Sequence, residues 1–351
     1  MTGGGASDRI ADMYHEIPFW LSIVFMVAGF AVLAWSSDVF VASSAAVARA
    51  LGVSPFIVGM VIIGFGTSAP ELLVSTLSGI SGHANLSIGN AYGSCVFNIA
   101  VILGVAAMIA PLVVRPSTAL VAGPGLTAIT LFSLWMLRDG ACSRTEALVL
   151  LLAFFVIMPL YCWFDQKTRN GGANPAEDVQ AAPGAPLAKH VLLLVVGLSA
   201  LVGSAHVLVW GAVDFARYLG VSDLVIGLTI VAAGTSLPEL ASAVASARRG
   251  ENEFVLGNII GSNLFNTLAV VGLATVIQPL TPGADGPSAF SPYVLSRDIP
   301  FVAGLSLTIL LFGLNWRSWR SPGVISRWKA ALWLLSFAAY MVIALLQEVR
   351  H

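Results

Sequence analysis

Apolar residues follow one another in long runs along this chain, and short polar segments separate the runs. A helix that spans a membrane needs about 20 mostly apolar residues. We predict ten such helices, which begin near Pro18, Ser54, Ala84, Ser117, Thr145, Leu187, Ser222, Glu251, Ile299 and Ala331. The sixth, Leu187–Tyr218, is long enough to tilt or to reach out of the bilayer. The ninth, near Ile299–Asn315, is short.

The composition agrees with this pattern. The chain is 57% hydrophobic and 10% charged, with a mean hydropathy of +0.88, whereas soluble domains carry about 25% charged residues. No basic tract suited to nucleic acid is present. Cys95, Cys142 and Cys162 are an odd, scattered set that indicates neither a disulfide framework nor a cysteine metal site. We therefore expect an integral membrane protein that is not an enzyme and needs no cofactor.

The polar segments divide the predicted protein into four parts. Residues 1–17 form an N-terminal tail that lacks the features of a cleaved signal peptide, 18–164 hold five helices, and 187–351 hold five more. Between them, Asp165–Pro186 is rich in Gly, Pro, Ala and charge, which is typical of a flexible linker. With both termini outside, 11 of the 17 Lys and Arg residues face the cytoplasm, so the positive-inside rule places the linker in the cytoplasm.

The two halves match each other without a gap at a shift of 168 residues. The block "GTSAPEL" at Gly66–Leu72 falls on "GTSLPEL" at Gly234–Leu240, and "GNAYGSCVFN" at Gly89–Asn98 falls on "GNIIGSNLFN" at Gly257–Asn266. Each half has five predicted helices, an odd number, so the second half must insert upside down relative to the first. This predicts an inverted-topology repeat, the architecture of many secondary transporters, whose site lies at the bilayer midplane.

The matching motifs place a proline and an acid in the middle of an apolar run. Proline removes one amide donor and disturbs the preceding helical turn, which predicts free carbonyls at Gly64, Thr67, Ala232 and Thr235. Unsatisfied backbone in hydrocarbon survives only where it lines a cavity or meets a ligand. We therefore expect helices 2, 3, 7 and 8 to be broken around an ion site.

The candidate ligands around these breaks are all oxygens or amides, which suits hard cations such as Ca²⁺. They are Glu71, Glu239, Thr67, Thr235, Ser68, Ser236, Asn98, Asn266, Ser94, Ser262, and the carbonyls of Gly64 and Ala232. Two ionised carboxylates without a Lys or Arg partner are costly at the midplane. One Ca²⁺, two Na⁺ or two protons would neutralise them, so an empty site would resist crossing and the protein would exchange ions.

These paired motifs resemble the two alpha-repeats of the cation/calcium exchanger superfamily, in its sodium/calcium exchanger branch. The resemblance covers both halves. It implies that Glu71 and Glu239 are carboxylates shared by Ca²⁺ and Na⁺, and that Thr67 and Thr235 contribute carbonyls and hydroxyls. It also implies that the serines of the set serve flanking Na⁺ sites, that Na⁺ entry drives Ca²⁺ extrusion, and that helices 1 and 6 slide past the other eight. A multi-pass protein of a prokaryotic inner membrane is expected.

Other readings stay open. Some relatives carry Asp where this chain has Asn266, and the neutral amide argues against potassium co-transport and leaves the sodium stoichiometry undetermined. An H⁺/Ca²⁺ antiporter would use the same carboxylates. A channel is disfavoured by the internal inverted symmetry, and no zinc-protease or nucleophile-elbow motif indicates an enzyme.

Asp38 and His206, counterparts under the shift, are expected at a gate or interface, and the oligomeric state is not determined.

Overall fold

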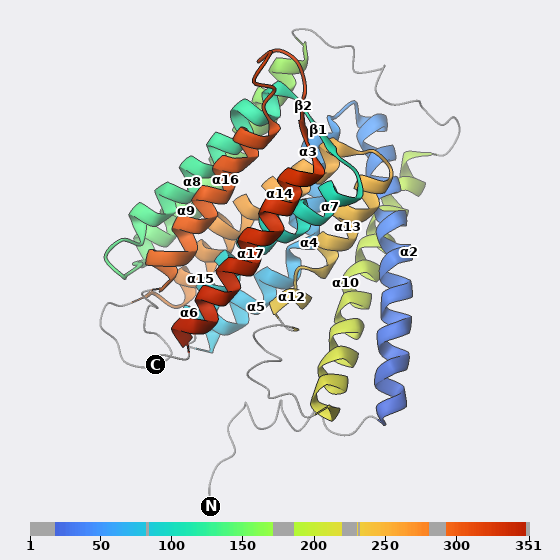
Figure 1. Ribbon diagram of the computed structural model, residues 1–351, viewed down its shortest axis with the longest axis vertical. Helices are drawn as coiled ribbons and strands as arrows, with labels where there is room; N and C mark the ends of the chain where they lie inside the picture. The colour runs from blue at the N-terminus through green and yellow to red at the C-terminus, as the bar shows by residue number, and fades with distance from the viewer. Residues whose placement is uncertain are drawn as a thin grey trace, which may run out of the picture.

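The computed structural model describes residues 18–81, 84–170, 186–219, 230, 232–280 and 293–348, and this part of the chain is almost entirely helical (Figure 1). The first half contains α2 (Phe19–Leu51), α3 (Pro55–Val58), η1 (Gly59–Ile63), α4 (Gly64–Thr67), α5 (Ala69–Ile80), α6 (Ala84–Phe97), η2 (Asn98–Leu103), α7 (Gly104–Ile109), β1 (Leu112–Val114), η3 (Thr118–Ala122), α8 (Gly123–Met136) and α9 (Arg144–Asn170). The second half contains α10 (Leu187–Tyr218), α12 (Ala232–Gly234), α13 (Leu237–Arg248), α14 (Asn252–Leu264), η5 (Phe265–Val270), α15 (Val271–Ile277), η6 (Val294–Asp298), α16 (Ile299–Gly313), β2 (Gly323–Ile325) and α17 (Arg327–Glu348). The η segments are π-helical turns.

The described helices account for most of the predicted spans. Eight of them are long and apolar enough to cross a membrane, and a ninth span follows if the bent pair Pro55–Thr67 and Ala69–Ile80 is counted as one. The predicted helix near Ser222 begins outside the described residues. Local signals set the boundary between the first two spans: α2 stops at Gly52, whose φ of 63° is left-handed, and the Ser54 hydroxyl accepts a 3.0 Å bond from the Ile57 amide to cap α3.

Two predicted boundaries differ from the structure. The ninth span runs over Val294–Gly313 and not from Ile299. Its first turn holds Arg297 and Asp298, and these pair with each other at 2.6 Å, so the polar residues that looked like a boundary stay inside the helix. Helix α9 continues to Asn170, six residues into the segment that was predicted as linker.

Helices 3 and 8 also differ from the prediction of breaks. Each is one continuous span, Leu86–Ile109 and Asn252–Ile277. In place of a break, each contains a π-helical turn, η2 beginning at Asn98 and η5 holding Asn266. Neither segment has a proline, so the helix widens by one residue without losing its backbone bonds. Such π turns are frequent at functional sites.

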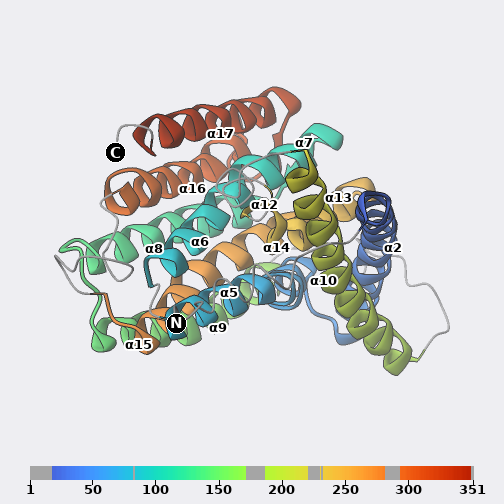
Figure 2. The same ribbon diagram turned by 90° about the horizontal axis from the view of Figure 1, so that it is seen from below.

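Helices α2 and α10 pack along each other at one flank of the other helices, as Figures 1 and 2 show from two directions. Glycines permit this close approach, because a Cβ at Gly197 would lie 3.0 Å from the backbone nitrogen of Phe40, and one at Gly29 would lie 2.9 Å from that of Leu208. Small residues commonly let membrane helices meet in this way. The two long helices therefore form a unit of their own beside the remaining bundle.

Helix α14 lies at the centre of that bundle, with every one of its residues from Phe254 to Leu264 buried. Gly257 and Gly261 bring it directly against the backbone of α3 and η1, because a Cβ at Gly257 would lie 2.9 Å from the Met60 nitrogen and one at Gly261 would overlap the Met60 carbonyl. This contact places the middle of α14 against the break in the first half.

A two-stranded antiparallel sheet joins the two halves at one end of the molecule (Figure 1). In it, β1 follows α7 and β2 precedes α17, with Leu112 opposite Ile325 and Val114 opposite Gly323. The predicted all-α class did not include this sheet. Three residues per strand are too few for the alternating pattern to stand out between apolar helices.

Candidate ion-binding site

The two matching motifs form the same local bend. Ser68 lies between α4 and α5 at φ −82° and ψ 8°, and Ser236 lies between α12 and α13 at φ −92° and ψ 10°. Pro70 and Pro238 stand at the start of the helices that follow, where a missing N–H leaves no helical bond unmade. The segments on either side of Ser68 are bent by 45°. Each bend therefore creates a helix N-terminus inside the protein.

The two motif glutamates occupy these internal N-termini. Glu71 lies in the first turn of α5 and Glu239 in the first turn of α13, and both side chains are completely buried. The start of a helix carries a partial positive charge that favours a carboxylate. The backbone thus supplies part of the electrostatic support that a Lys or Arg would otherwise give.

Reciprocal hydrogen bonds connect the two halves at the glutamates. The Ser68 hydroxyl donates to Glu239 Oε1 at 2.9 Å, and the Ser236 hydroxyl donates to Glu71 Oε1 at 3.0 Å. Each acid is therefore held by the serine three residues before the other acid, and the two carboxylates lie on facing segments. The second oxygen of each, Oε2, is buried and has no hydrogen-bond partner.

Asn258 of α14 links both sides of this arrangement. Its Oδ1 lies 3.4 Å from the Thr67 hydroxyl, whose shorter bond is to the Ile63 carbonyl at 2.9 Å. It lies 3.5 Å from the Ser262 hydroxyl, whose shorter bond is to the Gly64 carbonyl at 3.2 Å. Its Nδ2 donates to the Ser242 hydroxyl at 3.0 Å and to the Glu239 carbonyl at 3.4 Å. The amide therefore holds the first-half break against the helix that carries Glu239.

The two asparagines at the π turns have different surroundings. Asn98 Nδ2 donates to Asn263 Oδ1 at 2.9 Å, and Asn263 Nδ2 donates in turn to the Cys95 carbonyl at 3.3 Å. Asn98 Oδ1 is left buried without a partner. Asn266 is completely buried, and neither its Oδ1 nor its Nδ2 has a partner. Buried polar atoms in this condition usually indicate a ligand or water at the position.

One predicted free carbonyl is occupied. The Gly64 carbonyl accepts the Ser68 amide at 3.2 Å and the Ser262 hydroxyl at 3.2 Å. The prediction assumed that proline would disrupt this turn, but Pro70 lies after the bend and α4 keeps its last helical bond. Gly64 therefore contributes to the site as a hydrogen-bond acceptor in this structure.

The remaining predicted residues lie on or directly after α6 and α12. Ser94 is buried in α6, Thr235 is partly buried in the turn after α12, and the backbone of Ala232 begins α12. Among the described residues, no hydrogen bond connects Ser94 to either glutamate. Helices α6 and α12 set the positions of these three residues.

Sequence reasoning missed Asn258 and Asn263, which the structure places in the hydrogen-bond network. Asn258 and its counterpart Asn90 stand at the second position of the matching "GNxxGS" blocks, so the repeat itself offered a signal. Asn90 donates to the Ser75 hydroxyl at 3.2 Å. Asn263 had no such signal, because its counterpart is Cys95.

The donor set has the chemistry of a hard-cation site. Two buried carboxylates, the hydroxyls of Ser68 and Ser236 and the side-chain amide of Asn258 lie on the facing segments. The described residues contain no cluster of three or more His, Cys, Asp and Glu side chains. Oxygen donors of this kind suit Ca²⁺ and Na⁺. They do not suit the tetrahedral nitrogen and sulfur sites that zinc prefers.

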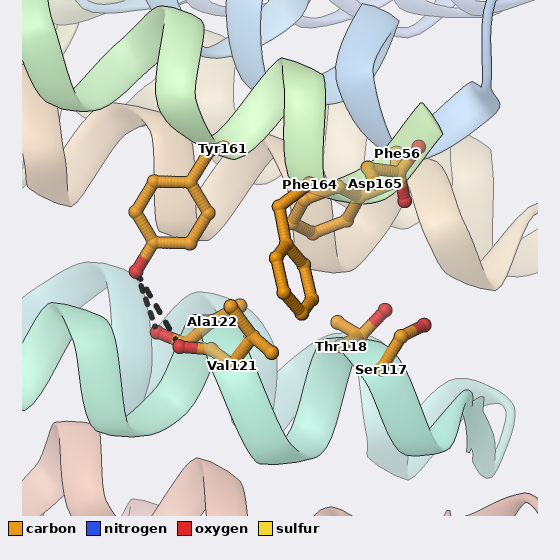
Figure 3. A pocket seen from close by; sticks show the side chains of 8 residues that line it. All are labelled: Phe56, Ser117, Thr118, Val121, Ala122, Tyr161, Phe164 and Asp165. Atoms are coloured by element: carbon orange, nitrogen blue, oxygen red, sulfur yellow. Dashed lines mark hydrogen bonds between the residues drawn. The ribbon is translucent and has the colours of Figure 1, made fainter. Parts of the chain in front are cut away.

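A small cavity elsewhere does not extend this site. It lies between α3, η3 and α9 and is lined by Phe56, Ser117, Thr118, Val121, Ala122, Tyr161, Phe164 and Asp165 (Figure 3). The Tyr161 hydroxyl points across it to the carbonyls of Val121 and Ala122. Its volume of about 10 Å³ has room for one water molecule.

Asp38 and His206 are also separate from the glutamates. Asp38 Oδ1 lies 3.7 Å from Arg249 Nε, and the Asp38 carbonyl accepts from Arg249 Nη2 at 3.3 Å. This contact joins α2 to the turn between α13 and α14, which agrees with the predicted interface role. His206 is exposed on α10.

Comparison with known proteins gives the same family in both halves. A family model described as "Sodium/calcium exchanger protein" matches residues 21–163 and 189–346. Inner membrane protein YrbG of Escherichia coli (strain K12) is 34% identical over 308 residues, which cover 86% of this chain and 91% of YrbG. Sodium/calcium exchanger MaX1 of Methanosarcina acetivorans is 28% identical over 362 residues, covering 92% and 96%.

The fold agrees with a solved exchanger. A structure of the sodium-calcium exchanger NCX_Mj, soaked with Na⁺ and Sr²⁺, superposes with a TM-score of 0.75 at 29% identity, covering 93% of this chain and 99% of the other. The resemblance seen in the paired motifs is confirmed over nearly the whole length. The chain belongs to the sodium/calcium exchanger protein family.

Proposed function

We propose that this protein is a secondary antiporter that exchanges Na⁺ for Ca²⁺ by alternating access. The observation that carries the proposal is the reciprocal pair of bonds between Ser68 and Glu239 and between Ser236 and Glu71. It brings two buried carboxylates together and leaves one oxygen of each without a partner. The exchanger family supports transport of ions and not catalysis, and eight apolar helices support a multi-pass membrane protein.

Charge explains why such a site would exchange ions. Two ionised acids at the midplane cost at least about 2.5 kcal/mol each if nothing compensates them. The described residues show no Lys or Arg in contact with Glu71 or Glu239. One Ca²⁺ or two Na⁺ would neutralise the pair, and the protein would resist crossing between its two states when empty. Coupled exchange follows from this difference between loaded and unloaded forms.

The ligand roles follow from the positions. Glu71 and Glu239 are proposed as carboxylates shared by both ions, and Thr67 and Thr235 as ligands beside them. The outer members of the set, proposed for Na⁺, are Ser68, Ser236, Ser94, Ser262 and the carbonyls of Gly64 and Ala232. Asn98 and Asn266 are proposed at the central position. With no acid at Asn266, the paired glutamates carry all of the site's negative charge. This disfavours a requirement for potassium.

The topology proposal is ten spans in two inverted five-helix repeats, with both termini outside and the linker in the cytoplasm. The site supports the inversion, because residues 168 apart make equivalent bonds to each other's segments. The α2–α10 pair contacts the breaks through two side chains. A Cβ at Gly66 would lie 2.9 Å from Leu198 of α10, and one at Gly234 would lie 2.5 Å from Val209. Sliding of this pair past the bundle would open the site to one side and then the other.

Flux measurements test the proposal. In membrane vesicles, an outward-directed Na⁺ gradient should drive uptake of radioactive Ca²⁺, and Glu71→Gln or Glu239→Gln should abolish it. Unaltered uptake in both variants would defeat the assignment of the site. Uptake that persists without Na⁺ and follows a pH gradient would instead establish H⁺/Ca²⁺ exchange on the same carboxylates. A membrane potential clamped with valinomycin and K⁺ would report the net charge moved.

A further inference from the structure

The segment between α16 and α17 contains a tandem repeat of three residues. Trp-Arg-Ser occurs at 316–318 and again at 319–321. Each copy ends a tight turn, since the Ser318 amide donates to the Asn315 carbonyl at 3.1 Å and the Ser321 amide donates to the Ser318 carbonyl at 3.0 Å. Residues 316–320 are all exposed. The loop therefore presents two Trp-Arg pairs, one turn apart, on the surface.

Hydrogen bonds hold this loop in one shape. A backbone bridge joins Leu314 to Pro322 across its base. Asn315 spans it, because Nδ2 donates to the Pro322 carbonyl at 3.3 Å and Oδ1 accepts the Arg317 amide at 3.1 Å. The Trp316 indole donates to the Leu311 carbonyl at 3.0 Å. A ligand would thus meet a preorganised surface and would lose less entropy on binding.

The region carries a positive charge, and only some of its cations bond to groups of the fold. No Asp or Glu occurs in the sequence between Asp298 and Glu348. Two of the four cations in that stretch are used inside the fold: Arg327 Nε donates to the Met108 carbonyl at 3.0 Å, and Lys329 Nζ to the Phe312 carbonyl at 2.7 Å. The other two are the loop arginines.

Arg317 and Arg320 have exposed side chains and form no ion pair with any described residue. Between them, the Ser318 oxygen accepts the Ser321 hydroxyl at 3.0 Å and keeps its own O–H free to donate. Two guanidinium groups and a hydroxyl on a fixed loop are donors that suit a phosphate group, which Arg binds in a bidentate manner.

The location points to the source of the phosphate. The loop connects two spans, Val294–Gly313 and Arg327–Gln347, at the end of the molecule that carries β1 and β2 (Figure 1). Its tryptophans are 59% and 61% exposed, and Trp328 nearby is 62% exposed. Indole rings favour the headgroup level of a bilayer. An anionic leaflet attracts neighbouring Lys and Arg.

We propose that the tandem Trp-Arg-Ser loop binds the phosphate of an anionic phospholipid. Arg317 and Arg320 donate to the phosphate oxygens, Ser318 contributes its hydroxyl, and the rings of Trp316 and Trp319 lie beside the glycerol and upper acyl chains. The site is at the membrane surface and is separate from the buried glutamates. It does not depend on which ions the protein exchanges.

Native mass spectrometry of the full-length protein tests this proposal, with phosphatidylglycerol and phosphatidylcholine offered at equal concentration. We expect phosphatidylglycerol to remain bound preferentially. Arg317→Gln together with Arg320→Gln should lower that preference by about fivefold for each arginine, from about 1 kcal/mol per cation at an anionic surface. The control, Lys189→Gln with Arg248→Gln, removes the same charge from exposed positions of α10 and α13 and should leave the preference unchanged.

Three results would overturn the assignment: equal retention of the two lipids by the unaltered protein, an undiminished preference in the Arg317/Arg320 variant, or the same loss in the control. Displacement of the lipid by a large excess of inorganic phosphate would show a site for free phosphate and would also refute it. Brominated phosphatidylglycerol should quench less fluorescence in Trp316→Phe with Trp319→Phe than in the unaltered protein. An equal loss of quenching with brominated phosphatidylcholine would show that the two rings contact any lipid. It would refute their placement beside a bound anionic lipid.

Discussion

Asn263 accepts a 2.9 Å hydrogen bond from the side-chain nitrogen of Asn98 and so fixes which end of the Asn98 amide is left without a partner. With Nδ2 occupied, Oδ1 is the atom left buried and unpartnered. Asn266, the counterpart of Asn98, has no equivalent support, because Cys95 stands where Asn263 would be in the other half. The two central amides are therefore not equivalent, although the repeat makes them look so.

Removing this support should weaken Ca²⁺ binding. In Asn263→Ala, the Asn98 amide becomes free to turn its N–H groups toward the cation. We expect the Ca²⁺ concentration for half-maximal uptake to rise about tenfold, equivalent to about 1.4 kcal/mol, with a smaller change in maximal rate. Measurement of uptake against Ca²⁺ concentration in proteoliposomes separates the two effects.

Cys95→Ser serves as the control, because it changes the equivalent position and keeps the backbone carbonyl that Asn263 contacts. It should transport with nearly unchanged half-saturation. If Asn98→Ala raises the half-saturation concentration but Asn263→Ala does not, then orientation of the amide by Asn263 has no role.

The reciprocal serine bonds predict equal effects from the two halves. Ser68→Ala removes the donor to Glu239, and Ser236→Ala removes the donor to Glu71. A hydrogen bond to a charged group contributes about 1.5–3 kcal/mol, so each variant should shift apparent ion affinity by about tenfold or more. The measurement is the Na⁺ and Ca²⁺ dependence of exchange in both variants.

A serine outside the site provides the comparison for these two. Ser204 is buried in α10 and donates to the Leu201 carbonyl of its own helix at 3.0 Å. Ser204→Ala should leave ion affinity near that of the unaltered protein. A large effect of Ser68→Ala together with none of Ser236→Ala would contradict the paired arrangement.

Much of this arrangement was predictable from the sequence. A proline four residues after glycine in an apolar run indicated a bend, and the repeat indicated that Glu71 and Glu239 would meet. The hydrogen bonds that orient them were not predictable, since they depend on side-chain positions across two segments 168 residues apart. The Gly64 carbonyl shows the limit well: proline predicted a free acceptor, but a serine from α14 occupies it.

The start of the ninth span was missed for a different reason. Polar residues inside a predicted membrane helix look like its end, as Arg297 and Asp298 did. Their mutual pairing and the bond from the Tyr340 hydroxyl to Asp298 at 2.9 Å satisfy their charges within the fold. Local composition does not reveal such partners, because Tyr340 is 42 residues away in the chain.

The tight contact of α14 with η1 predicts an asymmetry between equivalent glycines. A Cβ at Gly261 would overlap the Met60 carbonyl, whereas one at Gly93, its counterpart 168 residues earlier, would meet no atom within 4 Å. Gly261→Ala should therefore lower stability by about 1–3 kcal/mol, as overpacking does. Gly93→Ala should be nearly neutral. Thermal unfolding of the two purified variants in detergent measures the difference, and equal melting temperatures would contradict the close contact.

If the α2–α10 pair moves past the bundle, a covalent link that joins α2 to the bundle should stop transport. Asp38 on α2 lies against Arg249 in the turn between α13 and α14, and both side chains are exposed. A double variant Asp38→Cys with Arg249→Cys is therefore accessible to a short bifunctional reagent that links the two thiols through reducible disulfides. Of the native cysteines, Cys95 and Cys142 are buried and Cys162 is partly buried. Ca²⁺ uptake should fall after cross-linking and recover on reduction, and each single variant should be unaffected by the reagent. Full transport by the cross-linked protein would show that α2 does not move against the α13–α14 turn. The cycle would then be completed with this contact held fixed.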